Sequence, residues 1–226
     1  MKLVLLNGIV IVVAGLLAKL LSKFFSKSQL EFTLVMVNIV VLIVGIMGAI
    51  ETKLPILMLV SIVIGSLLGS IIDIDGKLQQ FGKSIENKFA KRDEGFSKAF
   101  IMMVMIHCIG SMAIIGPLNL GLTGDGNILW IKTILDFIST LIYGSIYGLG
   151  VIASALVVVL YQGSIFLLAK DLSAFLSPEV IVEIGAVGSV LIVALALDLL
   201  DIKKIKIANG LPAILIVILY QWVALW

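Results

Sequence analysis

The chain of 226 residues has the composition of an integral membrane protein, because 61% of its residues are hydrophobic and only 13% are charged. Soluble domains carry about 25% charged residues, and the mean hydropathy here is +1.24. The net charge of +2 gives no reason to expect nucleic-acid binding. The single Cys108 excludes an internal disulfide, and the single His107 lacks the spaced partners of a zinc site, so we expect neither a metal nor a cofactor.

Apolar runs separated by polar turns predict an all-α polytopic bundle of about eight transmembrane helices, since each span needs about 20 apolar residues. The first run could be a signal peptide, but no cleavage site precedes the basic stretch after it, so we interpret it as a retained span. Only residues 147–150 divide the fifth span from the sixth, where one kinked or broken helix is the alternative. The expected spans are 3–20, 32–50, 54–72, 97–116, 128–146, 149–169, 179–200 and 207–225.

Basic residues follow the first, third and seventh spans, which places these loops on one side of the membrane. The positive-inside rule makes that side cytoplasmic, so both termini are expected outside. Merging the fifth and sixth spans would put the basic segment 202–206 outside, which favours eight spans. Lys2 and Lys170 are minor exceptions on the other side. The basic residues of the three loops are Lys19, Lys23, Lys27, Lys77, Lys83, Lys88, Lys91, Arg92, Lys98, Lys203, Lys204 and Lys206.

The polar segment 76–93 lies between the third and fourth spans. Leu78, Phe81, Ile85 and Phe89 recur in it at helical spacing, with charged residues largely between them. This pattern predicts a basic amphipathic helix along the cytoplasmic face of the bilayer, next to anionic lipid. The alternative is a helix that docks a partner protein.

The two ends of the chain suggest an inverted repeat. Segments 42–63 and 191–218 each contain an apolar helix, a charged loop and a Leu-Pro start of another apolar helix. With eight spans the two segments have opposite orientations, as in many secondary transporters. We therefore divide the single membrane domain 1–226 into an N-terminal repeat 1–73, an interfacial helix 76–93, a signature region 97–146 and a C-terminal repeat 149–226.

A glycine-rich segment at 116–127 is expected to end the fourth span, because Pro117 and four glycines disfavour a continued helix. If this broken segment re-enters the membrane, its carbonyls with Asn119, Thr123 and Asp125 would form a polar site for a cation or a polar solute. The alternative is an external turn in which Asp125 and Asn127 cap the next helix.

Lys132 and Asp136 are four residues apart and therefore share one face of the fifth span. Asp136 is near the middle of that span, where a charge costs about 2.5–3.5 kcal/mol. Pairing with Lys132 would make both charges tolerable without any function. Ser139, Thr140 and Tyr143 continue the same stripe, so this face is expected to pack inward or to meet water.

Other polar residues interrupt the apolar spans. Gln162 is deep in the sixth span beside Gly163, which permits close helix packing. Asn7 is near a span end, where a structural role is the simpler interpretation. His107 beside Cys108 could relay a proton, although a lone histidine in an apolar helix is more often only hydrogen-bonded. The sequence contains no Ser-His-Asp, HExxH or GxSxG arrangement, so we expect no enzyme.

The segments 108–139, 148–163 and 202–213 resemble an uncharacterised family of bacterial membrane proteins catalogued as domain of unknown function 554. Asp198 departs from the Asn of that family, and the motif around Asn7 is shortened. The resemblance implies a multi-span inner-membrane protein of bacteria and supplies no activity. In the first segment the matching residues are Cys108, Gly110, Met112, Gly116, Gly121, Gly124, Asp125, Lys132, Leu135, Asp136 and Ser139.

Together these features predict a small secondary transporter or ion-coupled permease for a small polar solute or ion, acting as a homodimer in the lipid bilayer. The alternative is a membrane scaffold or sensor subunit that recruits a partner through its basic amphipathic helix. The predicted solute- or ion-binding residues are Asn119, Thr123, Asp125, Lys132, Asp136, Ser139 and Gln162.

Overall fold

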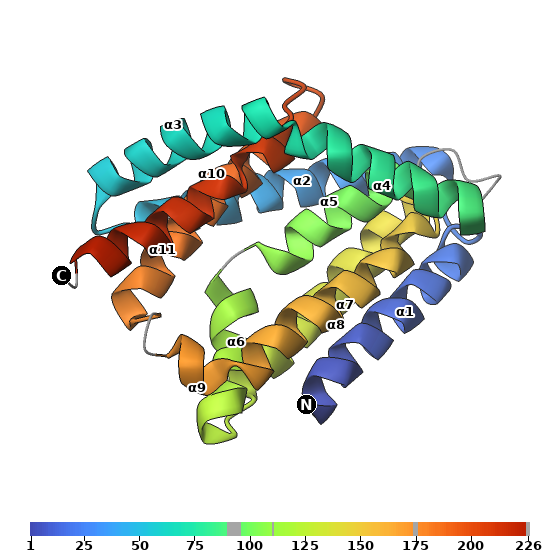
Figure 1. Ribbon diagram of the computed structural model, residues 1–226. Coiled ribbons are helices and arrows are strands. Elements are labelled where there is room, and N and C mark those ends of the chain that lie inside the picture. The colour runs from blue at the N-terminus through green and yellow to red at the C-terminus, as the bar shows by residue number, and fades with distance from the viewer. Residues whose placement is uncertain (90–95, 110, 174–175, 225–226) are drawn as a thin grey trace. The chain divides into compact units, whose positions relative to one another are not determined.

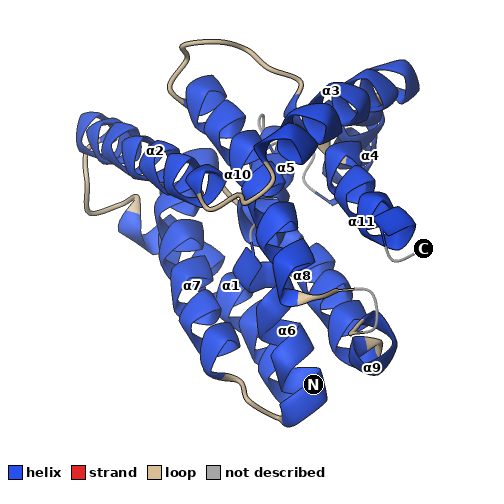
Figure 2. Cartoon of the chain, turned by 90° about the vertical axis from the view of Figure 1, so that its left-hand side faces the viewer, coloured by secondary structure: helices blue, strands red, loops and turns tan. Residues whose placement is uncertain are grey.

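The computed structural model describes residues 1–89, 96–109, 111–173 and 176–224, and these residues form helices joined by turns, without a strand (Figures 1 and 2). The helices are α1 (Lys2–Leu21), α2 (Lys27–Ile50), α3 (Pro55–Ile72), α4 (Ile74–Phe89), α5 (Phe96–Cys108), α6 (Ser111–Thr123), α7 (Asn127–Tyr147), α8 (Gly150–Leu167), α9 (Ala169–Leu172), α10 (Pro178–Leu199), the 3-10 turn η1 (Ile207–Gly210) and α11 (Pro212–Ala224).

The all-helical membrane bundle expected from the sequence is confirmed, with a smaller number of spans. Within the described residues, six helices are long and apolar enough to cross a bilayer, or seven if α5 and α6 count as one bent span. The six are α1, α2, α3, α7, α8 and α10. The last expected span, 207–225, begins with η1, and its α-helix has 13 residues up to Ala224, where the described part of the chain ends.

The fifth and sixth spans are separate helices. Gly148 ends α7 with a φ of 78°, in the left-handed region where glycine is favoured, and α8 begins at Gly150. The alternative of one kinked helix across residues 147–150 is therefore wrong.

The break near the fourth span occurs earlier than the sequence predicts. Residues 116–127 were expected to be irregular, but α6 continues through Pro117 to Thr123 and leaves only residues 124–126 as a turn. A buried proline removes one backbone N–H bond, and the remaining helical bonds together with neighbouring helices suffice to keep a membrane helix intact. The change of direction instead separates α5 from α6, at an angle of 56°.

The chain divides into two compact units. Unit 1 consists of residues 1–37, 78–108 and 112–169, and unit 2 consists of residues 38–77, 109–111 and 170–226. In unit 1, α1 packs against both α7 and α8, and α5 packs against α8 and α7. In unit 2, α3 packs against α11 and η1, and α10 packs against α11.

Small residues allow the helices of unit 1 to approach closely. A Cβ atom added at Gly8 would lie 2.3 Å from Val159 Cγ2, and one added at Gly15 would lie 2.3 Å from Ile152 Cγ1. Membrane helices associate through such small-residue contacts, because lipid offers no hydrophobic drive between them. The buried stripe of α1 accordingly consists of Val4, Asn7, Gly8, Ile11, Ala14, Gly15 and Ala18.

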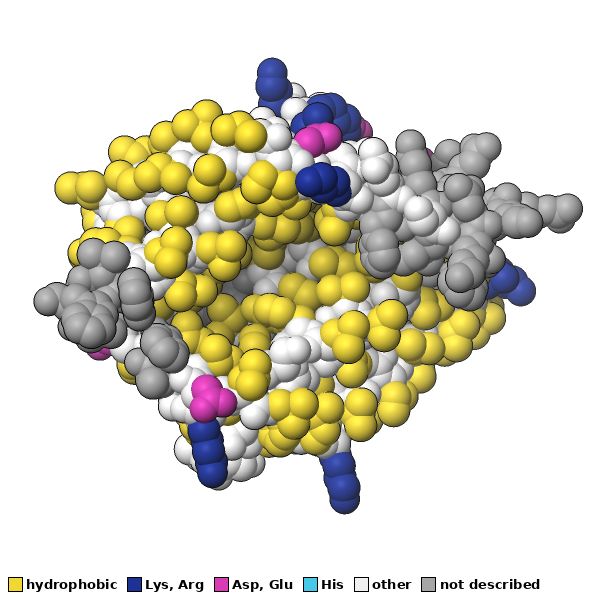
Figure 3. All heavy atoms as spheres, viewed as in Figure 1, with side chains coloured by type: hydrophobic (Ala, Val, Ile, Leu, Met, Phe, Trp, Pro, Cys, Tyr) yellow, Lys and Arg dark blue, Asp and Glu magenta, His cyan; other side chains and the backbone are white. Residues whose placement is uncertain are grey.

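The outer faces of the helices carry large apolar side chains. Ile9 on α1 is 58% exposed and Ile71 on α3 is 82% exposed, and Figure 3 shows apolar side chains spread along both helices. Exposed apolar faces around small or polar inner stripes are typical of helices that contact lipid. The amphipathic helix expected at 76–93 is present as α4, but the side chains of Phe81, Ile85 and Phe89 lie outside the described ones.

Glycines on α3 set the packing of unit 2. A Cβ atom at Gly65 would lie 2.2 Å from the backbone nitrogen of Ala213, and one at Gly69 would lie 1.9 Å from the carbonyl oxygen of Asn209. Because these neighbours are backbone atoms, neither can move aside without shifting η1 or α11.

Gly65→Ala is therefore expected to destabilise the protein by about 1–3 kcal/mol, the usual cost of overpacking. Thermal unfolding of the detergent-purified protein measures the effect. Ser70→Ala, on the exposed side of the same helix, is the matched control and should leave the melting temperature within error. Equal melting temperatures for Gly65→Ala and wild type would contradict this packing.

Candidate functional site

A buried ion pair on α7 forms the centre of the polar cluster in unit 1. Lys132 Nζ contacts Asp136 Oδ1 one helical turn away. Lys132 is 6% exposed and Asp136 is 2% exposed. The expected inward stripe of this helix is confirmed, since Thr140 and Tyr143 are fully buried on the same face. The pair is the strongest electrostatic contact of the cluster, because both charges are removed from water.

Two amide side chains from other helices complete the cluster. The Nδ2 atom of Asn7, on α1, donates to Asp136 Oδ2 at 3.0 Å and to Gln162 Oε1 at 3.1 Å. Gln162 comes from α8, and both amides are fully buried. The cluster therefore joins α1, α7 and α8, and α1 packs against both of the other two helices.

Two polar atoms of these amides have no hydrogen-bond partner among the described residues: Asn7 Oδ1 and Gln162 Nε2. A buried polar group left without a partner costs about 1–3 kcal/mol. One of these atoms is an acceptor and the other is a donor, and their side chains are bonded to each other. The cluster can therefore satisfy a polar guest that both accepts and donates hydrogen bonds.

His107, on α5, contacts the cluster from a fourth helix. Its Nε2 atom lies 3.2 Å from Thr140 Oγ1, 3.4 Å from Ser139 Oγ and 3.8 Å from Asp136 Oδ1. The imidazole is fully buried. It therefore faces the same carboxylate as Lys132, from another direction.

Hydroxyl groups lie at both ring nitrogens of His107. Ser154 Oγ is 3.3 Å from Nδ1 and donates its own proton to the carbonyl of Val151 at 2.7 Å. Ser139 Oγ, beside Nε2, donates to the carbonyl of Leu135 at 2.9 Å in the same way. Each ring nitrogen therefore has a hydroxyl oxygen that can accept its proton.

The predicted residues of the glycine-rich segment form a separate, local cluster. Thr123 Oγ1 donates to the carbonyl of Asn119 at 2.9 Å and accepts from the N–H of Asp125 at 3.2 Å. Asp125 Oδ1 accepts from the N–H of Asn127, the first residue of α7, at 3.0 Å. The N-cap of α7 is Gly126, which has no side-chain cap, so neither Asp125 nor Asn127 occupies the N-cap position. From Asn127 to Asp136 the helix rises about 14 Å, so Asp125 does not contact the buried cluster.

Of the predicted site residues, the structure brings together Lys132, Asp136 and Gln162, with Ser139 alongside through His107. It adds Asn7, which the sequence analysis assigned a structural role. In the sequence, Asn7 lies in the same helical stripe as the small residues of α1, and this position indicates that its side chain is on the buried face of the helix. The described residues contain no group of acidic, His and Cys side chains suited to a metal ion.

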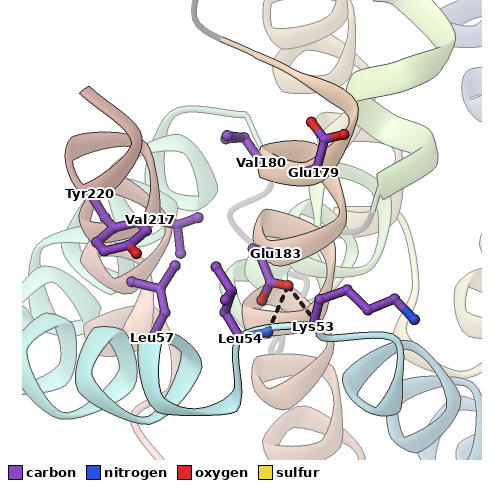
Figure 4. Close-up of a pocket in the computed structure, with 8 residues that line it drawn as sticks. All are labelled: Lys53, Leu54, Leu57, Glu179, Val180, Glu183, Val217 and Tyr220. Carbon is purple, nitrogen blue, oxygen red and sulfur yellow. Dashed lines mark hydrogen bonds between the residues drawn. The ribbon is translucent and has the colours of Figure 1, made fainter. Parts of the chain in front are cut away.

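A second buried carboxylate, Glu183 on α10, belongs to unit 2. It accepts a hydrogen bond from Thr52 Oγ1 at 2.5 Å. It also accepts from the N–H of Lys53 at 2.6 Å and from the N–H of Leu54 at 3.2 Å, the two bonds that Figure 4 shows. These donors precede α3, so Glu183 places a negative charge at the positive end of that helix. A pocket of about 200 Å³ lies beside it, lined mainly by apolar side chains (Figure 4). With one oxygen bonded to the Thr52 side chain and the other to two backbone N–H groups, Glu183 holds the α2–α3 turn in place.

Comparison with known proteins gives a family without an assigned activity. The family described as "Protein of unknown function (DUF554)" matches residues 3–222. The chain is 41% identical over 168 residues to the uncharacterized membrane protein YdfK of Bacillus subtilis (strain 168), a match that spans 74% of this chain and 70% of YdfK. It is 26% identical over 164 residues to the uncharacterized protein YqgA of Escherichia coli (strain K12), across 70% of each chain. No solved structure matches it.

Glu183→Ala is expected to lower the free energy of unfolding by several times the usual hydrogen-bond contribution, because each bond to a charged group contributes about 1.5–3 kcal/mol. Thermal unfolding in detergent measures this loss. Glu51→Ala, at an exposed carboxylate on the same α2–α3 turn, is the matched control and should unfold like wild type. A Glu183→Ala variant as stable as the control would contradict the inference that the hydrogen bonds of Glu183 hold the α2–α3 turn in place.

Proposed function

We propose a transport function for this chain, which belongs to the family of proteins of unknown function DUF554. In this proposal the protein is a small secondary transporter or ion-coupled permease of the bacterial inner membrane. Its solute or ion site is the cluster of Asn7, Lys132, Asp136 and Gln162. The observation that carries the proposal is a buried ion pair whose neighbouring amides leave one acceptor and one donor unsatisfied.

Stability does not account for this cluster. Desolvating a lysine and a carboxylate costs several kcal/mol per ion, and replacing such a pair by apolar residues is often neutral or stabilising. Leaving Asn7 Oδ1 and Gln162 Nε2 unpartnered adds a further cost. Ionisable residues inside membrane helices are typical of solute paths, ion paths and proton relays. The cluster therefore supports a binding role over a purely structural one.

Charge placement supports an orientation for the proposed transporter. The basic loops after the first, third and seventh expected spans favour a common cytoplasmic side, with the N-terminus outside. In the proposal the C-terminus is outside as well, which requires α11, with 13 described residues, to cross the membrane as the eighth span. In the same proposal two copies form a homodimer, and the segments 42–63 and 191–218 are related as an inverted repeat.

A second candidate function is partner recruitment through α4. The predicted amphipathic segment is a helix over Ile74–Phe89, and Leu78 at its start is half-buried. A stoichiometric partner that copurifies with wild type and is lost when Leu78, Phe81 and Phe89 are replaced by Ser would support a scaffold. Copurification of no partner, together with solute flux, would favour transport.

Proteoliposomes that contain the purified protein are expected to take up at least one tracer from a panel of labelled sodium, rubidium, amino acids, sugars and monocarboxylates. Asp136→Asn and Lys132→Gln should each reduce that uptake by at least about tenfold, because removing one partner leaves the other charge buried alone. Asp171→Asn, an exposed carboxylate replaced in the same way, should transport like wild type.

Two results would contradict the proposal in different ways. Unchanged uptake by Asp136→Asn would contradict the assignment of the site. Uptake no greater than that of protein-free liposomes, for every tracer in the panel, would contradict the transport function.

A further inference from the structure

We infer that the cluster of Asn7, Lys132, Asp136 and Gln162 binds a proton and a small monovalent carboxylate together. This inference rests on the proposed transport function and names its substrate class and its coupling ion. It follows from the charge of the cluster, from the donors around Asp136 and from the two unpartnered amide atoms.

The net charge of the cluster favours binding a proton and an anion together. When His107 is neutral, the cluster has one positive charge on Lys132 and one negative charge on Asp136, and both side chains are buried. A proton alone would leave the buried cluster at +1, and an anion alone would leave it at −1. Either net charge is costly in a buried site. A proton and a monovalent anion that enter together keep the cluster neutral, so each increases the affinity for the other.

Asp136 is the group that accepts the proton. When one of its carboxylate oxygens binds the proton, the side chain becomes a neutral acid and Lys132 keeps its ammonium charge. Lys132 then lacks an anionic partner, and an incoming carboxylate takes the place of Asp136 as its counter-ion. A carboxylate with one negative charge restores the original balance, whereas a neutral solute does not.

The amides of Asn7 and Gln162 can hydrogen-bond to either protonation state of Asp136. With Asp136 ionised, Asn7 Nδ2 donates both to Asp136 and to Gln162. When both amide groups rotate by half a turn, Asn7 Oδ1 accepts the acid proton of Asp136 and also accepts a hydrogen bond from Gln162 Nε2. Asn7 Nδ2 is then free to donate to the bound anion. The two amides thus make the same number of hydrogen bonds with either protonation state of Asp136. In the protonated state, Asn7 Nδ2 is an additional donor for the bound anion that pairs with Lys132.

His107 gives the proton a second position. Its Nε2 atom lies 3.8 Å from Asp136 Oδ1, so a small approach suffices for a hydrogen bond. The charged and titratable groups that face Asp136 are Lys132 on its own helix and His107 and Cys108 on α5, with Tyr161 of α8 beyond Cys108. From α1 and α8 the groups in direct contact are the amides of Asn7 and Gln162, which carry no charge.

Equilibrium dialysis of the full-length protein in detergent tests the inference, with radiolabelled lactate, pyruvate and acetate as probes at about pH 5.5 and about pH 7.5. At least one probe should bind, and it should bind more tightly at about pH 5.5 than at about pH 7.5, because one proton binds with each anion. In weakly buffered solution the protein should take up about one proton per bound anion. Lactamide, the uncharged analogue of lactate, should not bind.

The variants separate the roles of the two charges. Asp136→Asn should bind the carboxylate equally at both pH values and take up no proton, because its amide mimics the acid form. Lys132→Gln should bind none of the probes. Ser164→Ala, on the exposed side of α8 two residues from Gln162, should match wild type.

Three results would overturn the inference: no binding of any of the three carboxylates, anion binding without proton uptake, or a pH dependence that persists in Asp136→Asn. The proposed transport function fails separately. Asp136-dependent uptake of a sodium, sugar or amino-acid tracer, by a protein that binds no monocarboxylate, would preserve transport and reject proton–carboxylate coupling.

Discussion

The buried ion pair between Lys132 and Asp136 is the constraint on which the rest of unit 1 depends. Two charges inside an apolar bundle must be paired and hydrogen-bonded, because water is not there to solvate them. One helix can supply the pair, since the residues are one turn apart. It cannot supply the remaining hydrogen bonds, so α1 and α8 have to bring the amides of Asn7 and Gln162 to the same point.

The close packing of α1 follows from this requirement. Asn7 reaches Asp136 only if the backbone of α1 lies near α7 and α8, and Gly8 and Gly15 allow that approach. Ile9 and other large apolar side chains of α1 are exposed, while its buried face combines polar, small and apolar residues. In a soluble helix the exposed face would be polar. Here the exposed face is apolar, because lipid and not water surrounds it.

The contrast between the two buried carboxylates separates a structural group from a candidate binding group. Glu183 accepts three hydrogen bonds from one turn of the chain, and these bonds explain its presence. Asp136 has a lysine, an amide and a nearby imidazole around it, and two atoms of the adjoining amides remain unpartnered. A site with unsatisfied groups is less stable than a closed one, which is expected where a guest supplies the missing bonds.

Much of the fold could be predicted from the sequence, because apolar length and helical spacing are local properties. The inward stripe of α7 is an example, since Asp136, Thr140 and Tyr143 repeat at helical intervals. The partners of Asp136 could not be predicted in this way, because Asn7 is 129 residues distant in sequence. The helical course of residues 116–123 was also missed, since the local preference of Pro117 was outweighed by the surrounding helical bonds.

The most direct test of the account compares the stability and the transport of an apolar double variant, Lys132→Met with Asp136→Leu. Each single substitution should destabilise the protein by about 3–5 kcal/mol, because it leaves one buried charge unpaired. The double variant should recover a melting temperature near that of wild type and yet transport none of the tracers that wild type carries. A double variant that still transports at the wild-type rate would contradict the claim that this ion pair is the functional site.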